Sequence, residues 1–154
     1  MTEFEGLKLR QARAADVSAI VALLSDDPLG AKRERPGDPA YDKAFAAIDA
    51  DPNNELWVIE GEAGTVQGIL QLTFIPGLSH TAGTRAMIEG VRVADALTGK
   101  GVGTWFFRQM IERAREKGAR LVQLTSDKTR KDAIRFYENL GFTASHEGFK
   151  LKFD

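Results

Sequence analysis

The sequence predicts an α/β protein, a mixed β-sheet with helices on both faces. One observation is a set of short apolar runs, alternating or continuous, that are typical of strands. Another is the order strand, helix, strand between residues 87 and 125, because a crossover helix places its two strands in parallel. The strands are expected at residues 7–12, 56–59, 66–75, 87–93 and 119–125.

The helices follow from apolar spacing and from capping residues. Asp16 is a good N-cap for a helix with apolar residues at 17, 20, 21 and 24. The segment 25–39 holds three prolines and a charge run, which indicate an irregular, solvated loop. Further helices are expected at 41–50, at 102–118, and from a cap at Asp127 or Thr129 to Gly141. An antiparallel hairpin of residues 142–144 and 149–153 would end the chain.

Composition and charge limit the class of protein. A chain of 154 residues suits one domain with a substantial core, so a single domain spanning 1–154 is expected. The net charge of −1 gives no electrostatic argument for nucleic acid or a membrane as partner. Without a bilayer-spanning run or a signal-peptide pattern, the chain is expected in the cytoplasm. The absence of cysteine excludes disulfides and a cysteine nucleophile, and two histidines are too few for a metal site.

A glycine-rich turn lies between the strand at 87–93 and the helix that follows it. The turn reads Thr98-Gly99-Lys100-Gly101-Val102-Gly103. A strand, a tight turn and a helix in this order direct backbone N–H groups and the positive end of the helix at one point, where an anion such as phosphate can bind. A P-loop would need glycine where Ala94 stands, and a dinucleotide fingerprint needs a wider glycine spacing, so both are excluded. For the turn alone, a glycine C-cap or hairpin remains the alternative.

Two motifs resemble those of the GNAT N-acetyltransferases. The turn is similar to the coenzyme A loop of that family, Arg/Gln-x-x-Gly-x-Gly/Ala, although Thr98 replaces the usual Arg or Gln. The segment 133–142, Ala-Ile-Arg-Phe-Tyr-Glu-Asn-Leu-Gly-Phe, is similar to the family's late helix, Ala-x-x-Phe-Tyr-x-x-x-Gly-Phe. Many members carry Asn where this chain has Arg130. The resemblance implies a mostly antiparallel sheet with a splayed central parallel strand pair.

The resemblance also implies acetyl-CoA as co-substrate and no metal. Glycines in the turn let backbone N–H groups approach the pyrophosphate, because no Cβ is in the way. The pantetheine arm would pair with the open edge of the strand at 89–93, where it separates from the strand at 121–125. Lys100 or Arg130 could reach the 3′-phosphate. The cofactor-binding residues implied are Val91, Arg92, Val93, Thr98, Gly99, Lys100, Gly101, Val102, Gly103, Thr104, Arg130, Ala133 and Phe136.

Two residues are expected to take part in the transfer of the acetyl group to a primary amine by direct attack in a ternary complex. Tyr137 matches the tyrosine that serves in the family as general acid to the leaving thiolate. Strand alternation places Glu89 on the face of Val91 and Val93, where partial burial would raise the pKa of its carboxyl and suit it as base. A salt bridge to Arg85 is the structural alternative for Glu89, and a water chain is the alternative base. A backbone N–H near residues 92–93 would stabilise the oxyanion.

The acceptor, a small-molecule or peptide amine, is not identified by residues 25–50. Homodimers are common in the family. The main rival to an enzyme is a non-catalytic acyl-CoA-binding regulatory module, which would keep the glycine turn and lose Tyr137; the presence of Tyr137 counts against it. A nucleotide-binding domain is disfavoured because both phosphate-motif spacings fail.

Overall fold

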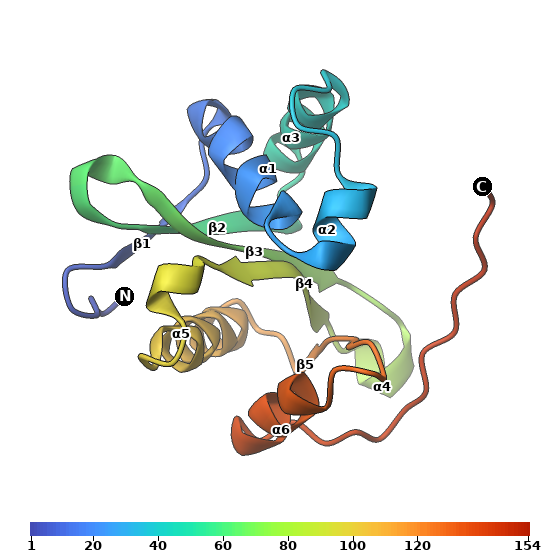
Figure 1. The fold of residues 1–154 in the computed structure, drawn as a ribbon. Helices are drawn as coiled ribbons and strands as arrows, with labels where there is room; N and C mark the ends of the chain where they lie inside the picture. The colour runs from blue at the N-terminus through green and yellow to red at the C-terminus, as the bar shows by residue number, and fades with distance from the viewer. The chain divides into compact units, whose positions relative to one another are not determined.

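Five strands form one mixed sheet, in agreement with the expected α/β class. The computed structural model describes residues 1–154, which divide into two compact units, Met1–Gln123 and Leu124–Asp154. Within the first unit the strands lie in sequence order, with antiparallel pairing from β1 to β4 and parallel pairing of β4 with β5 (Figure 1). Their bounds are β1 Lys8–Gln11, β2 Asn54–Glu60, β3 Val66–Ile75, β4 Arg85–Val93 and β5 Leu121–Gln123.

Helices cover both faces of this sheet. Three of them, α1 Val17–Ser25, α2 Pro28–Arg33 and α3 Ala40–Ala50, lie on one face, and α5 Val102–Glu116 lies on the other (Figure 1). Single 3₁₀ turns occur at Ala14–Asp16, Glu62–Gly64 and Asp95–Leu97. None of the helices of the chain is both long and apolar enough to cross a lipid bilayer.

The two faces of the sheet bury different residues, because successive side chains of a strand point to opposite sides. The register pairs Trp57 with Leu70, and these side chains face α5, whose Phe106 and Met110 are fully buried. Val58 pairs with Ile69 on the opposite face, where both pack with Ile20 of α1. The central strands β2 and β3 therefore have helices packed against both faces, and β4 pairs with the edge of β3.

A β-bulge interrupts β4 in its second half. Opposite β3, the pairing steps from Gln71–Glu89 to Ile69–Arg92, so three residues of β4 span two of β3. Gly90 has a φ of 61°, a left-handed conformation that suits glycine because it has no Cβ. A bulge of this kind bends the strand and changes which face the following side chains take.

Two connections contain short helical segments, and the first of them differs from the sequence expectation. The expected loop after residue 25 contains helix α2, which begins with Asp27 as N-cap and Pro28 in the first turn, a favourable start for a helix. The connector between β3 and β4 contains the single turn α4, Ser79–Ala82, in which residues 80–82 all have positive φ. Three non-glycine residues in this conformation are unusual, since each costs about 1–2 kcal/mol.

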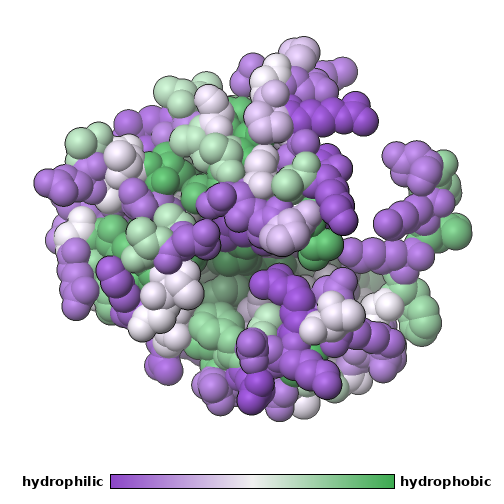
Figure 2. Space-filling view, viewed as in Figure 1, coloured by the Kyte–Doolittle hydropathy of each residue, from purple (hydrophilic) through white to green (hydrophobic).

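The second unit contains one helix, α6 Lys131–Asn139, and an extended C-terminal segment. The expected end hairpin is wrong, because residues 142–154 contain no strand. In this segment Phe149, Leu151 and Phe153 alternate with lysines and remain exposed, which gives the alternating green and purple of Figure 2. The alternation is typical of a strand, but a strand also needs a partner for its backbone groups, and sequence alternation alone does not supply one.

Candidate functional site

The glycine turn ends in an uncapped helix N-terminus, as the anion-site interpretation requires. Gly99 and Gly101 have φ values of 77° and 81°, and Gly101 is the N-cap of α5. Only glycine adopts this conformation without strain. No side chain caps α5, so the N–H groups of its first turn have no protein acceptor on a side chain. Lys100 is exposed between the two glycines. These N–H groups and the helix dipole favour an anionic ligand.

The strand that leads to this turn has an open edge. β4 pairs with β5 only from Arg85 to Met87, opposite Leu121 to Gln123, and continues to Val93 without that neighbour. This short pairing agrees with the splayed central parallel pair expected from the sequence. The remaining edge of β4 can exchange hydrogen bonds with an extended, amide-bearing ligand, as in the addition of a strand to a sheet.

The bulge changes the position expected for Glu89. Sequence alternation placed Glu89 with Val91 and Val93, and this is wrong, because the extra residue at the bulge reverses the order of faces. The register puts Glu89 opposite Gln71, and Arg92 opposite Ile69, so both side chains face the α1–α3 side of the sheet. Glu89 is exposed rather than partly buried, and no salt bridge joins it to Arg85. The partial burial on which the choice of Glu89 as base was argued is therefore absent.

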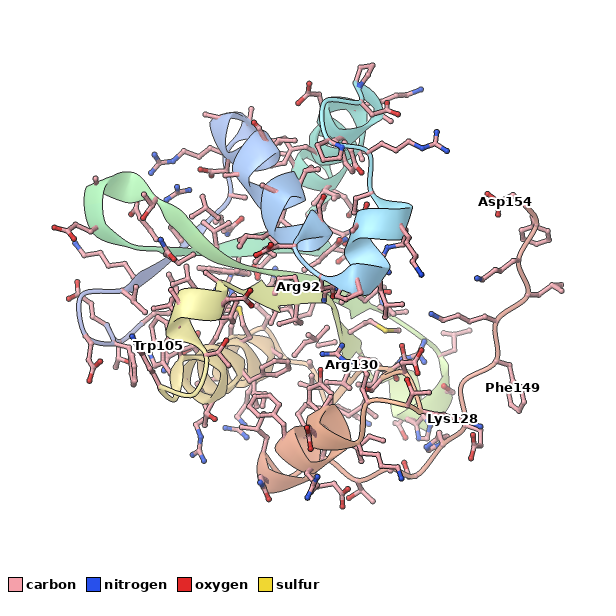
Figure 3. All side chains as sticks on the ribbon, in the orientation of Figure 1. Arg92, Trp105, Lys128, Arg130, Phe149 and Asp154 are labelled. Atoms are coloured by element: carbon pink, nitrogen blue, oxygen red, sulfur yellow. The ribbon has the colours of Figure 1, made fainter.

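An ion pair that the sequence did not predict connects β4 to α2. The Nη2 of Arg92 lies 2.9 Å from Oδ2 of Asp27, and both side chains are partly buried. The other carboxylate oxygen of Asp27 accepts a hydrogen bond from the backbone N–H of Gly30 and thereby caps α2. Figure 3 shows Arg92 on β4 next to α2. The Asp-Pro pair at 27–28 signals a helix start, but no local pattern indicates its partner.

The chain after α2 is held by a second polar group, Glu34. Its carboxylate accepts hydrogen bonds from Arg33 and from the hydroxyl of Tyr41, at 2.7 and 3.0 Å. The hydrogen bond from Arg33, and secondarily that from Tyr41, holds the pKa of Glu34 below its usual range, against the effect of burial; the charge of Arg92 adds to this. Tyr41 also accepts a hydrogen bond from the backbone of Arg35. The segment expected to be an irregular loop is thus ordered beside β4.

The other expected site residues belong to the second unit. Arg130 is the N-cap residue of α6, and its side chain does not cap the helix. Asp127 and Thr129, expected as caps, instead bond to each other before the helix begins, and the hydrogen bonds from Thr129 lower the pKa of Asp127. Ala133, Phe136 and Tyr137 are half-buried residues of α6. The Tyr137 ring meets Phe136 and Phe142 edge-on, at centroid distances of 5.5 and 6.1 Å.

Known proteins are similar to this chain in sequence and in fold. The model of the acetyltransferase (GNAT) family matches residues 17–142. Aminoalkylphosphonate N-acetyltransferase of Salmonella typhimurium is 29% identical over 142 residues, which cover 92% of this chain and 88% of that protein. Streptothricin acetyltransferase of Streptomyces lavendulae is 28% identical over 157 residues, which cover 88% of this chain and 80% of that protein.

A solved structure, described as a transcriptional regulator from Bacillus halodurans C-125, is 47% identical to this chain. The two structures superpose with a TM-score of 0.90, and the match covers 96% of this chain and 99% of the other chain. The family match spans most of the chain, from α1 to the end of α6, and includes both motifs and the bulged strand β4. The chain therefore belongs to the GNAT family of acetyltransferases.

Proposed function

We propose that this protein is an acetyl-CoA-dependent N-acetyltransferase that acts on a small primary amine. The observation that carries the proposal is the uncapped N-terminus of α5 directly after the open edge of β4. A pyrophosphate at the turn 98–103 and an extended pantetheine arm along residues 89–93 need these two features in this order. Membership of a family that uses acetyl-CoA supports the same assignment.

The proposed reaction is a direct transfer within a ternary complex. The neutral amine attacks the thioester carbon, the C–S bond breaks, and the thiolate leaves with a proton. A backbone N–H near Arg92 or Val93, at the bulge of β4, stabilises the oxyanion. Tyr137 of α6 gives its proton to the thiolate, and Glu89 takes the amine proton directly or through water. The chain has no cysteine that could carry an acetyl-enzyme intermediate.

We place the acceptor on the α1–α3 side of β4. Glu89 and Arg92 face this side, and the Asp27–Arg92 ion pair holds α2 beside them. Gln71 lies opposite Glu89 and is hydrogen-bonded to Asn54 at 3.0 Å, so it adds a polar side chain to this face of the sheet. A small polar amine suits such a surface. The names of the Salmonella and Streptomyces relatives point to small molecules as their acceptors.

Thiol release from acetyl-CoA in the presence of single amines tests this function. The first panel holds an aminoalkylphosphonate, streptothricin, amino acids and simple diamines, each with an amine-free blank. We expect acetylation of at least one small amine, and about a 10²-fold lower turnover in Tyr137→Phe, as for the loss of a general acid. Tyr137→Phe with unchanged turnover would remove Tyr137 from the mechanism.

A non-catalytic acyl-CoA-binding regulatory module is the second candidate. The description of the Bacillus halodurans protein as a transcriptional regulator favours it. Such a module would bind acetyl-CoA without thiol release for any amine, whereas the enzyme would release thiol in proportion to the acetylated amine. We also propose that residues 124–154 complete the same single domain, because α6 carries the proposed general acid.

A further inference from the structure

The N-terminal residues form a tight turn that lies outside both motifs of the proposed site. Phe4 and Leu7 exchange two backbone hydrogen bonds, of 3.1 and 2.8 Å. The two residues between them, Glu5 and Gly6, have positive φ values of 46° and 83°, as in the two-residue turns that close hairpins. This N-terminal turn, residues 2–7, is therefore a defined element that holds the Phe4 ring in one place.

The N-terminal turn packs on the beginning of α5. The ring of Phe4 stacks on Trp105, with 5.6 Å between centroids and 29° between planes. The backbone N–H of Thr2 donates to Oε1 of Gln109, one helical turn further along, at 3.3 Å. A Cβ added to Gly101 would lie 3.7 Å from Cζ of Phe4, so the ring borders the N-cap of the helix. Figure 3 shows Trp105 beside the N-terminal segment.

The N-cap of α5 needs support that its own sequence does not provide. Gly99 and Gly101 give the turn the conformation it needs, but glycine also has the largest conformational freedom to lose on ordering. No side chain caps the helix, which removes the usual means of fixing its first turn. Trp105 is only 8% exposed, so it is a firm anchor in that first turn. Phe4 contacts both this anchor and the position of the N-cap.

We propose that Phe4 is a positioning residue for the cofactor, because the N-terminal turn holds the glycine turn 98–103 in its binding conformation. This role rests on the proposed function, since the ligand at the turn is the pyrophosphate of acetyl-CoA. Phe4 touches Trp105 and borders the position of Gly101, and it acts on the turn through these two contacts. Loss of the ring lowers the fraction of molecules with a competent turn, and the apparent affinity falls by that fraction.

Calorimetric titration of acetyl-CoA into Phe4→Ala, Phe4→Tyr and wild-type protein tests the proposal. We expect the Kd of Phe4→Ala to rise about tenfold, as for a turn that is competent in about a tenth of molecules. Phe4→Tyr keeps the stacked ring and should restore the wild-type Kd. At saturating acetyl-CoA, kcat and the KM for the amine should stay unchanged. Phe45→Ala, which removes a half-buried ring from α3 on the other face of the sheet, is the matched control and should leave the Kd unchanged.

A second measurement does not need the ligand. Amide hydrogen exchange of residues 101–104 in the free protein should be faster in Phe4→Ala than in wild type, while the exchange of β2 and β3 stays the same. An unchanged Kd together with unchanged exchange would overturn the positioning role. Equal increases in Kd for Phe4→Ala and Phe45→Ala would also overturn it, because the effect would then be general destabilisation. Failure of wild-type protein to bind acetyl-CoA would instead refute the proposed function.

Discussion

Gly101 is the residue on which the cofactor assignment depends most. Its φ of 81° is unfavourable for any residue with a Cβ, and most of all for a β-branched one. We expect Gly101→Val to abolish acetyl-CoA binding in a protein that still folds, at a cost of about 1–2 kcal/mol for the strained residue. Calorimetric titration checks the binding, and thermal unfolding checks the fold.

Gly118→Val is the matched control for this substitution. Gly118 follows the other end of α5, has a φ of 84°, and has open space around the position of a Cβ. It should therefore cause similar strain and leave acetyl-CoA binding intact. If Gly101→Val kept the wild-type affinity, the glycine turn would not be the cofactor loop.

Glu89 can be tested as base by its effect on the pH dependence of the rate. A carboxylate that acts as general base contributes an acidic limb to the pH dependence of kcat/KM. In Glu89→Gln we expect this acidic limb to disappear and the rate to fall about 10²-fold. Glu62→Gln, an exposed carboxylate in the turn after β2, should keep the wild-type profile. Superimposable profiles for Glu89→Gln and wild type would assign proton removal to a water chain.

The local sequence predicted the glycine turn correctly, but it predicted the wrong sheet face and the wrong burial for Glu89. The turn follows from glycines in one short stretch, whose φ requirements are local. The face of Glu89 depends on the bulge at Gly90, which arises only when β4 pairs with β3. A glycine inside a strand is a known signal for a bulge, so Gly90 could have indicated this one from the sequence. The pairing of Asp27 with Arg92 left no such signal, because the two residues are distant in sequence.

At the scale of elements, α2 is held to β4 by Asp27, which serves as both helix cap and ion-pair partner. Asparagine caps helices as well as aspartate does but carries no charge. Asp27→Asn should therefore lose only the ion pair, worth up to about 1 kcal/mol for groups partly open to solvent. Asp27→Ala should lose about 1 kcal/mol more, because the cap is lost as well. Denaturant unfolding of both variants measures the two contributions.

The same two variants test the place of the acceptor. If α2 lines the amine site, both substitutions should raise the KM for the amine, and the Kd of acetyl-CoA should not change. A rise in the Kd of acetyl-CoA with an unchanged KM for the amine would contradict this placement, since α2 would then border the cofactor.

The elements that the sequence predicted well are those with a strong internal pattern. Strands β3 and β4 alternate or are β-branched, and α5 has a long apolar stripe that ends near Gly118, as observed. Helix α2 was missed because prolines and charges dominate its surroundings, although Asp27 and Pro28 are favourable starting residues. The C-terminal hairpin was predicted from the alternation of apolar and polar residues at 149–153. Such alternation does not indicate whether a partner strand is present.

At the scale of the whole molecule, a buried ion pair connects the sheet to α5. Glu55 of β2 is 4% exposed, and its carboxylate oxygens lie 2.9 and 2.8 Å from the guanidinium of Arg113. Burial acts to raise the pKa of Glu55, but the hydrogen bonds and charge of Arg113 outweigh it, so the pKa is lowered in the folded protein. Arg113 also lies 5.8 Å over the ring of Trp57. The pair thus contributes to stability while Glu55 is ionised.

The sign of this pKa change predicts how stability depends on pH. Because the pKa of Glu55 is lower in the folded than in the unfolded chain, its contribution is complete above the usual value of 4.5 and is lost as pH falls through the folded pKa. We expect Glu55→Gln to lower the free energy of unfolding at pH 7 by about 3 kcal/mol, since it leaves a partly buried guanidinium without its partner. The difference from wild type should shrink below pH 4.5. A difference that stayed constant from pH 7 to pH 3 would contradict the role of the Glu55 charge.

The central claim, that the turn before α5 binds acetyl-CoA, is tested most directly by isothermal titration of the wild-type protein. Acetyl-CoA, dephospho-coenzyme A and ATP are compared under one set of conditions. We expect acetyl-CoA to bind in the micromolar range, ATP to bind much more weakly, and dephospho-coenzyme A to lose only a little affinity. This result would identify the cofactor and show which end of it the turn binds. Folded protein that binds none of the three, or prefers ATP, would contradict the account and remove the basis for the roles of Tyr137 and Glu89.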